Sequence, residues 1–111
     1  MKLFFIIAAL LLSQLVASQS NAGEQGLAQK LIGEWEGPRH IRAYYADGSF
    51  TLDPQPGQKP LGTWKLEGRK LITQFAEEPT PMIEHIVKIT DTEMVSVYDS
   101  TRYTYKRVVH Q

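Results

Sequence analysis

Turn-forming residues interrupt this chain every few positions from Gly33 onward, and their spacing limits the folds open to it. Between the interruptions, apolar and polar residues alternate with a period of two, which is the pattern of a strand with one buried face. Asp47-Gly48 stands between two such runs and predicts a tight hairpin, because glycine tolerates the positive φ that the turn needs. Residues 53–60 and 77–81 contain prolines, which cannot donate to a sheet ladder, so we expect loops there. The pattern predicts an all-β domain.

We expect eight short antiparallel strands joined in sequence by turns and loops. They cover residues 34–37, 40–46, 49–53, 61–67, 70–76, 82–90, 94–99 and 101–109. Eight consecutive strands can close on themselves, and closure removes the exposed edges that would invite aggregation. We therefore predict a short up-and-down barrel. One or two helical turns are expected before it, within residues 24–32, because Leu27 and Leu31 are four apart and Gly33 can end a helix.

The same alternation assigns side chains to the inside of the barrel. The expected inward residues are Phe50, Leu52, Trp64, Leu66, Leu71, Thr73, Phe75, Ile83, His85, Val87, Ile89, Tyr103, Tyr105 and Arg107. A barrel of eight strands encloses a space that side chains alone can fill, or that holds one small ligand. Because several inward residues are large aromatics, we expect side chains to fill this space.

The N-terminal residues have the pattern of a cleavable signal peptide. Lys2 is followed by an apolar run over residues 3–12, and a small, polar segment ends at Ser20 and Ala22. We predict cleavage after Ala22, with these two small residues in the protease pocket. A spanning helix needs about 20 apolar residues, so removal is favoured over a membrane anchor. Residues 1–22 are then the signal peptide, and residues 23–111 form one secreted or periplasmic domain.

The amino-acid composition excludes several kinds of site and of binding partner. The chain has no cysteine, which excludes a lipid-anchored cysteine, a disulfide framework, a zinc–thiolate site and a cysteine nucleophile. Twelve Lys and Arg balance twelve Asp and Glu, so neither nucleic acid nor, after cleavage, a membrane is an expected partner. The three histidines lack the spacing of a metal site, and we expect no cofactor.

Two short motifs add a family resemblance. Gly33-Glu34-Trp35 resembles the Gly-x-Trp motif of lipocalins and other calycin-type barrels, and Gly62-Thr63-Trp64 repeats it. With the segment 45–50, these motifs resemble the small lipocalin-like domains of exported bacterial proteins. The resemblance covers most of residues 31–107. It implies that Trp35 packs across the barrel floor with Arg107 over it, whereas fold similarity alone does not determine function.

Six residues are candidates for ligand contact: Trp35, Tyr45, Trp64, His85, Tyr103 and Arg107. The two tryptophans could form an aromatic floor for a ligand, although such residues in small barrels are more often core. Arg107 could hold an anion, or its stem could cover Trp35 in a cation–π contact of about 0.5–2 kcal/mol, which we favour. Tyr45, with Tyr44 and Tyr98, could stack on sugar rings.

His85 is the candidate with the clearest chemistry. Its neighbours at two-residue spacing, Ile83 and Val87, predict that the imidazole faces the apolar interior, where burial lowers its basicity. We favour a structural role for this histidine over a ligand-binding or catalytic one.

These observations favour an exported, non-enzymatic binding or interaction module with a lipocalin-like fold. Its expected partner is a small apolar ligand or another exported protein, and contact through the outer surface is favoured over a ligand inside the barrel. Two alternatives stay open: a small hydrolytic enzyme with a site around His85, and an inhibitor or stabilising subunit of another exported protein. No Gly-x-Ser-x-Gly elbow, phosphate-binding loop or glycosidase carboxylate pair supports catalysis. The oligomeric state is left open.

Overall fold

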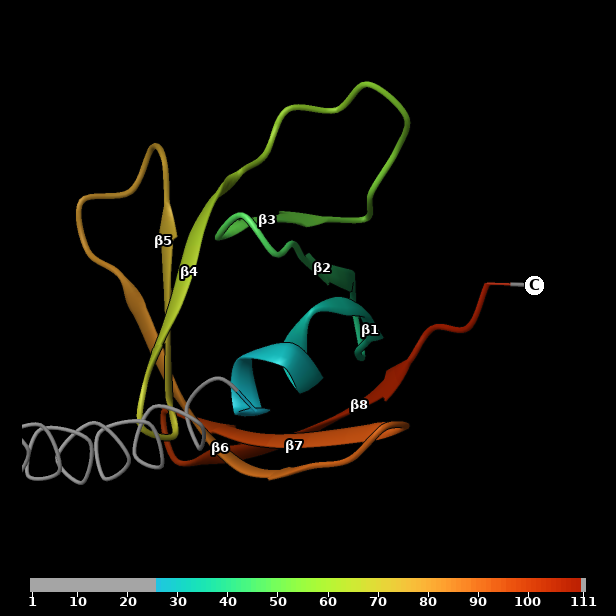
Figure 1. The fold of residues 1–111 in the computed structure, drawn as a ribbon. Helices are drawn as coiled ribbons and strands as arrows, with labels where there is room; N and C mark the ends of the chain where they lie inside the picture. The colour runs from blue at the N-terminus through green and yellow to red at the C-terminus, as the bar shows by residue number, and fades with distance from the viewer. Residues whose placement is uncertain (1–25, 111) are drawn as a thin grey trace, which may run out of the picture.

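The computed structural model describes residues 26–110, which form a closed barrel of eight antiparallel strands in sequence order (Figure 1). A helical segment over residues 26–31 precedes the barrel. The strands are β1 (Gly33–Glu36), β2 (Ile41–Tyr44), β3 (Ser49–Leu52), β4 (Gly62–Glu67), β5 (Lys70–Phe75), β6 (Met82–Ile89), β7 (Glu93–Tyr98) and β8 (Thr101–Arg107). The predicted all-β barrel with a short N-terminal helix is confirmed. The predicted signal peptide, residues 1–22, lies outside the described residues.

The barrel closes where its first and last strands meet. Trp35 and Glu36 of β1 pair with Arg107 and Lys106 of β8, and this seam is only two residue pairs long. Trp35 is fully buried, and the Cζ atom of Arg107 lies 4.2 Å from the centre of its ring. The expected cation–π contact between the two ends of the chain is therefore present.

The helical segment is fastened to this seam by side-chain hydrogen bonds. Trp35 Nε1 donates to the Leu31 carbonyl at 2.9 Å. Arg107 donates to the carbonyls of Lys30, Ile32 and Asp91, at 2.9 Å for Ile32 and 2.7 Å for Asp91. Because Asp91 belongs to the β6–β7 connection, the Arg107 guanidinium joins the helical segment to the end of the barrel at which β6 turns into β7. The helical segment therefore covers this end of the barrel.

Gly33 has a steric role in the seam. Its φ is +132°, and a Cβ atom at this position would collide with the Arg107 guanidinium. A positive φ is strained for residues that carry a side chain. The glycine of the Gly33-Glu34-Trp35 motif therefore leaves the space in which Arg107 reaches the carbonyls beyond it.

The core occupies the interior between the seam and the middle of the barrel. Its buried members are Leu31, Trp35, Tyr44, Phe50, Leu71, Ile86, Met94 and Tyr105. Phe50 meets Phe75 edge to face with ring centres 5.0 Å apart, and Tyr44 meets Trp64 similarly at 5.9 Å. Such aromatic pairs add about 0.5–1.5 kcal/mol beyond area burial. Side chains fill this part of the barrel, as the sequence predicts.

The predicted orientation of β6 is wrong. Glu84 and Ile86 are buried, whereas His85 is exposed and Ile83 and Val87 are 46% and 45% exposed. The cause is the register with β5, in which inward-facing Leu71 pairs with Glu84. Directly opposite residues share one face of a sheet, so this pairing turns Glu84 inward.

A register shift between Ile86 and Lys88 changes the alternation further along β6. Such an irregularity re-aims the residues that follow it. Ile89 accordingly packs against the core, as expected for that residue, although Ile83, His85 and Val87 face outward.

Trp35→Ala should destabilise the protein by about 3–5 kcal/mol, because it removes the largest buried side chain at the seam. Urea unfolding measures the loss. Val87→Ala on the outer face is the control and should change stability by less than about 0.5 kcal/mol. A loss below about 1 kcal/mol for Trp35→Ala would contradict its place in the core.

Gly33→Ala should cost about 1–3 kcal/mol, since the new methyl group combines a positive φ with a collision at Arg107. Gly26→Ala is the matched control: nothing lies within 4 Å of the added Cβ in the helical segment. There the substitution should be neutral or stabilise by up to about 1 kcal/mol. Equal thermal midpoints for the two variants would refute the steric role of Gly33.

Candidate ligand-binding site

A cavity of about 340 Å³ opens inside the barrel. Its walls are the β1–β2 connection (residues 37–40), Arg42 on β2, Met82 at the start of β6, and three tyrosines of β7 and β8, namely Tyr98, Tyr103 and Tyr105. In an up-and-down barrel, the β1–β2, β5–β6 and β7–β8 connections lie at one end. That end is opposite the helical segment. The expectation that side chains fill the whole barrel is therefore wrong at this end.

Arg42 lies at the base of the cavity and forms an ion pair with Glu84, which is buried behind it. Nη1 of Arg42 donates to Oε1 of Glu84 at 2.6 Å, and the Ser96 hydroxyl donates to Oε2 at 2.9 Å. Glu84 is fully buried, while the Arg42 side chain is 17% exposed. Burying two charges is costly unless their hydrogen bonds are satisfied, and both carboxylate oxygens of Glu84 have a donor.

Aromatic groups hold the Arg42 guanidinium from two sides. Its Nη1 also donates to the Tyr44 hydroxyl at 3.2 Å, and its Cζ lies 4.6 Å from the centre of the Tyr105 ring. Burial lowers the pKa of Arg42, but the neighbouring Tyr44, Glu84 and Tyr105 raise it by more, so the net shift is upward. For the phenols of Tyr44 and Tyr105, burial disfavours the charged form and therefore raises the pKa. The base of the cavity therefore carries a permanent cation among neutral phenols.

A second polar pair, His40 and Asp53, lies at the open end of the cavity. Nδ1 of His40 lies 2.7 Å from Oδ2 of Asp53, and the Ile41 amide donates to Oδ1 at 2.9 Å. The Ile41 hydrogen bond, followed by that of His40, lowers the pKa of Asp53. These contacts tie the β1–β2 connection to the end of β3. Within the described residues, no serine or threonine lines the cavity, so His40 has no such nucleophile to activate.

Of the six sequence candidates, only Tyr103 lines this cavity. Trp35 and Arg107 lie at the closed end and form its floor. Trp64 packs against Tyr44, and its Nε1 donates to the carbonyl of Tyr45 at 2.9 Å. Tyr45 itself is exposed outside the cavity, so the structure does not assemble these candidates into one site.

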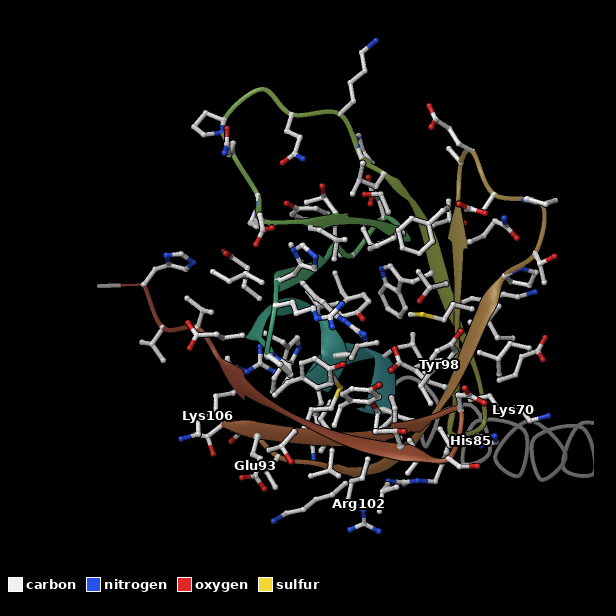
Figure 2. All side chains as sticks on the ribbon, turned by 180° about the vertical axis from the view of Figure 1, so that it is seen from behind. Lys70, His85, Glu93, Tyr98, Arg102 and Lys106 are labelled. Atoms are coloured by element: carbon white, nitrogen blue, oxygen red, sulfur yellow. The ribbon has the colours of Figure 1, made fainter. Side chains whose placement is uncertain are left out.

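His85 lies outside the barrel, contrary to its predicted inward orientation. It pairs with Lys70 of β5 and Val97 of β7, and Figure 2 shows it beside Lys70 on the outer side of the strands. Arg102 points away from the interior in the same view. No hydrogen bond among residues 26–110 involves the His85 ring, and it does not line the cavity.

Sequence reasoning missed Arg42 and Glu84. In both strands, apolar residues occur at odd and at even positions. Alternation therefore could not show which face of the strand is buried. The available signal was indirect, because Arg42 is two residues before the aromatic Tyr44 and therefore shares its face. Glu84 needed the register with Leu71, which pattern alone does not supply.

Two further features are absent from the described residues. No group of three or more His, Asp or Glu side chains in residues 26–110 could hold a metal ion. The same part of the chain contains no helix that is long and apolar enough to cross a membrane.

The chain matches no protein-family model, and no curated protein or solved structure matches it. The family resemblance therefore rests on the motifs alone. The function has to be argued from the geometry of the cavity.

Arg42→Leu should destabilise the protein by about 3–5 kcal/mol, because it leaves the buried carboxylate of Glu84 without its cation. Arg42→Leu combined with Glu84→Leu should recover most of that loss, since no buried charge remains. Lys88→Leu breaks the exposed pair with Glu93 and should cost less than about 1 kcal/mol. Urea unfolding of the four proteins, wild type included, measures the differences. A double variant as unstable as the single one would contradict the ion-pair argument.

Proposed function

We propose that this chain is an exported, non-enzymatic binding protein with a lipocalin-like fold, whose barrel holds one small and mostly apolar ligand. The cavity between the β1–β2 connection and the tyrosines of β7 and β8 carries this proposal. Ligand pockets are typically about 300–1,000 Å³ and are lined by apolar and aromatic side chains with a few placed polar groups. A volume of about 340 Å³ fits a small ligand.

The chemistry of the walls supports the same function. The aromatic side chains of Tyr98, Tyr103 and Tyr105 line the cavity, and Met82 is a flexible side chain that adapts to the shape of a ligand. Arg42 borders the cavity at its base and offers a charged group that could orient a ligand. The leader pattern at residues 1–22 supports export, and the Gly-x-Trp motif supports the lipocalin-like assignment.

A ligand inside the barrel is now favoured over contact through the outer surface. The cavity is a concave space with convergent side chains, whereas the exposed Ile83 and Val87 flank the polar His85 on an outer sheet face. A hydrolytic site around His85 is not supported, because this residue does not line the cavity and its ring has no hydrogen-bond partner among the described residues.

The proposal is tested with N-phenyl-1-naphthylamine, a neutral probe that fluoresces in apolar surroundings. The protein is expressed with its full N-terminal sequence and purified in the form that the host produces. Wild-type protein should bind one equivalent of the probe. Met82→Trp fills the cavity and should weaken binding by about tenfold or more, since a well-packed space does not admit a ligand.

Val87→Trp is the matched control, because it adds the same side chain to the outer face of the same strand. It should leave probe affinity unchanged. Circular dichroism checks that both variants keep the barrel. If wild-type protein does not bind the probe, or if Met82→Trp and Val87→Trp bind it equally well, the ligand is not held in this cavity.

A further inference from the structure

Arg42 has donors that the protein does not use. A guanidinium carries five N–H groups, and Nη1 of Arg42 donates to Glu84 and Tyr44. Within residues 26–110, Nε and Nη2 of Arg42 donate to no acceptor. The side chain is four-fifths buried and lines the cavity. A planar set of donors therefore remains available beside a space that is lined mainly by aromatic and apolar side chains.

Glu84 positions this arginine without competing for its remaining donors. Its two oxygens accept from Nη1 of Arg42 and from the Ser96 hydroxyl, so each has a partner. The Tyr105 ring covers one face of the guanidinium. Arg42 is thus held in one orientation before a ligand arrives, which lowers the entropy cost of binding.

The described lining of the cavity contains basic side chains and no carboxylate. Arg42 is balanced by Glu84, and His40 at the rim is paired with Asp53. Arg39 also lines the cavity and makes no ion pair with any described carboxylate. The lining therefore suits a ligand with one negative charge.

The other lining side chains indicate what the uncharged part of the ligand should be. Three tyrosine rings and Met82 surround a space near the lower end of the usual pocket range, about 300–1,000 Å³. Aromatic walls favour stacked or edge-to-face contact with a flat ring. A guanidinium fork matches the two oxygens of a carboxylate in a bidentate contact.

We infer that the cavity binds a small aromatic acid, with its ring among Tyr98, Tyr103 and Tyr105 and its carboxylate on Nε and Nη2 of Arg42. This inference rests on the proposed function and names its ligand class. Glu84 and Ser96 act as positioning residues, since they hold Arg42 and leave the ligand to it.

The test compares 2-naphthoate with 2-naphthamide, which share one flat ring system and differ in charge. Isothermal titration at neutral pH measures both dissociation constants on the full protein as the host produces it. The acid should bind wild-type protein about tenfold or more tightly than the amide, because a charge-assisted bidentate contact is stronger than a neutral one.

The decisive variant is Arg42→Gln combined with Glu84→Gln, which removes both buried charges together and avoids leaving one unpaired. It should reduce the preference for the acid to about threefold or less, because the remaining lining arginine, Arg39, is exposed and its charge is screened by solvent. It should change the amide affinity by less than about threefold. Lys88→Gln combined with Glu93→Gln removes an equivalent pair from the outer surface and should leave both affinities unchanged.

The outcomes separate the inference from the function beneath it. If the amide binds as tightly as the acid, or if the preference for the acid survives in the Arg42 and Glu84 double variant, the acid subsite is refuted and the cavity remains a binding site. If neither compound binds the folded wild-type protein, the aromatic-acid inference is refuted, and the result with N-phenyl-1-naphthylamine decides the proposed function separately.

Discussion

The seam between β1 and β8 is the contact on which the rest of the barrel depends. It has only two residue pairs, so the backbone ladder between these strands is short. Arg107 reinforces the closure by stacking on Trp35 and by donating to carbonyls of the helical segment and the β6–β7 connection. Gly33 leaves room for that side chain. Without closure there is no enclosed interior, and the cavity at the other end has no complete wall.

The two inward-facing arginines illustrate how surroundings assign different roles to one residue type. Arg107 meets backbone carbonyls with both Nη atoms and with Nε, so it is engaged in holding the chain together. Among residues 26–110, Arg42 donates hydrogen bonds through Nη1 alone, and its guanidinium borders an open space. The seam arginine is structural, whereas the cavity arginine has the unused donors on which a ligand could be oriented.

The candidate site was only partly accessible to sequence reasoning. Tyr103 was identified because its alternation with Tyr105 and Arg107 on β8 is unambiguous. His85 was placed on the wrong face because β6 has apolar residues at both parities, and the more apolar parity proved to be the exposed one. Glu84 was hidden for the same reason. Its burial is compensated by Arg42, which is 42 residues away in the chain, and no local pattern records such a pairing.

Local patterning was enough to predict eight strands, their antiparallel order and the short helix, because alternation and turn residues act over a few neighbouring positions. The contact between Trp35 and Arg107 was expected only from the resemblance of Gly33-Glu34-Trp35 to the lipocalin motif. The direction in which β6 faces and the meeting of Arg42 with Glu84 depended on the folded chain. Both follow from the register between strands, which shifts whole sets of side chains from one face to the other and is set by packing across the barrel.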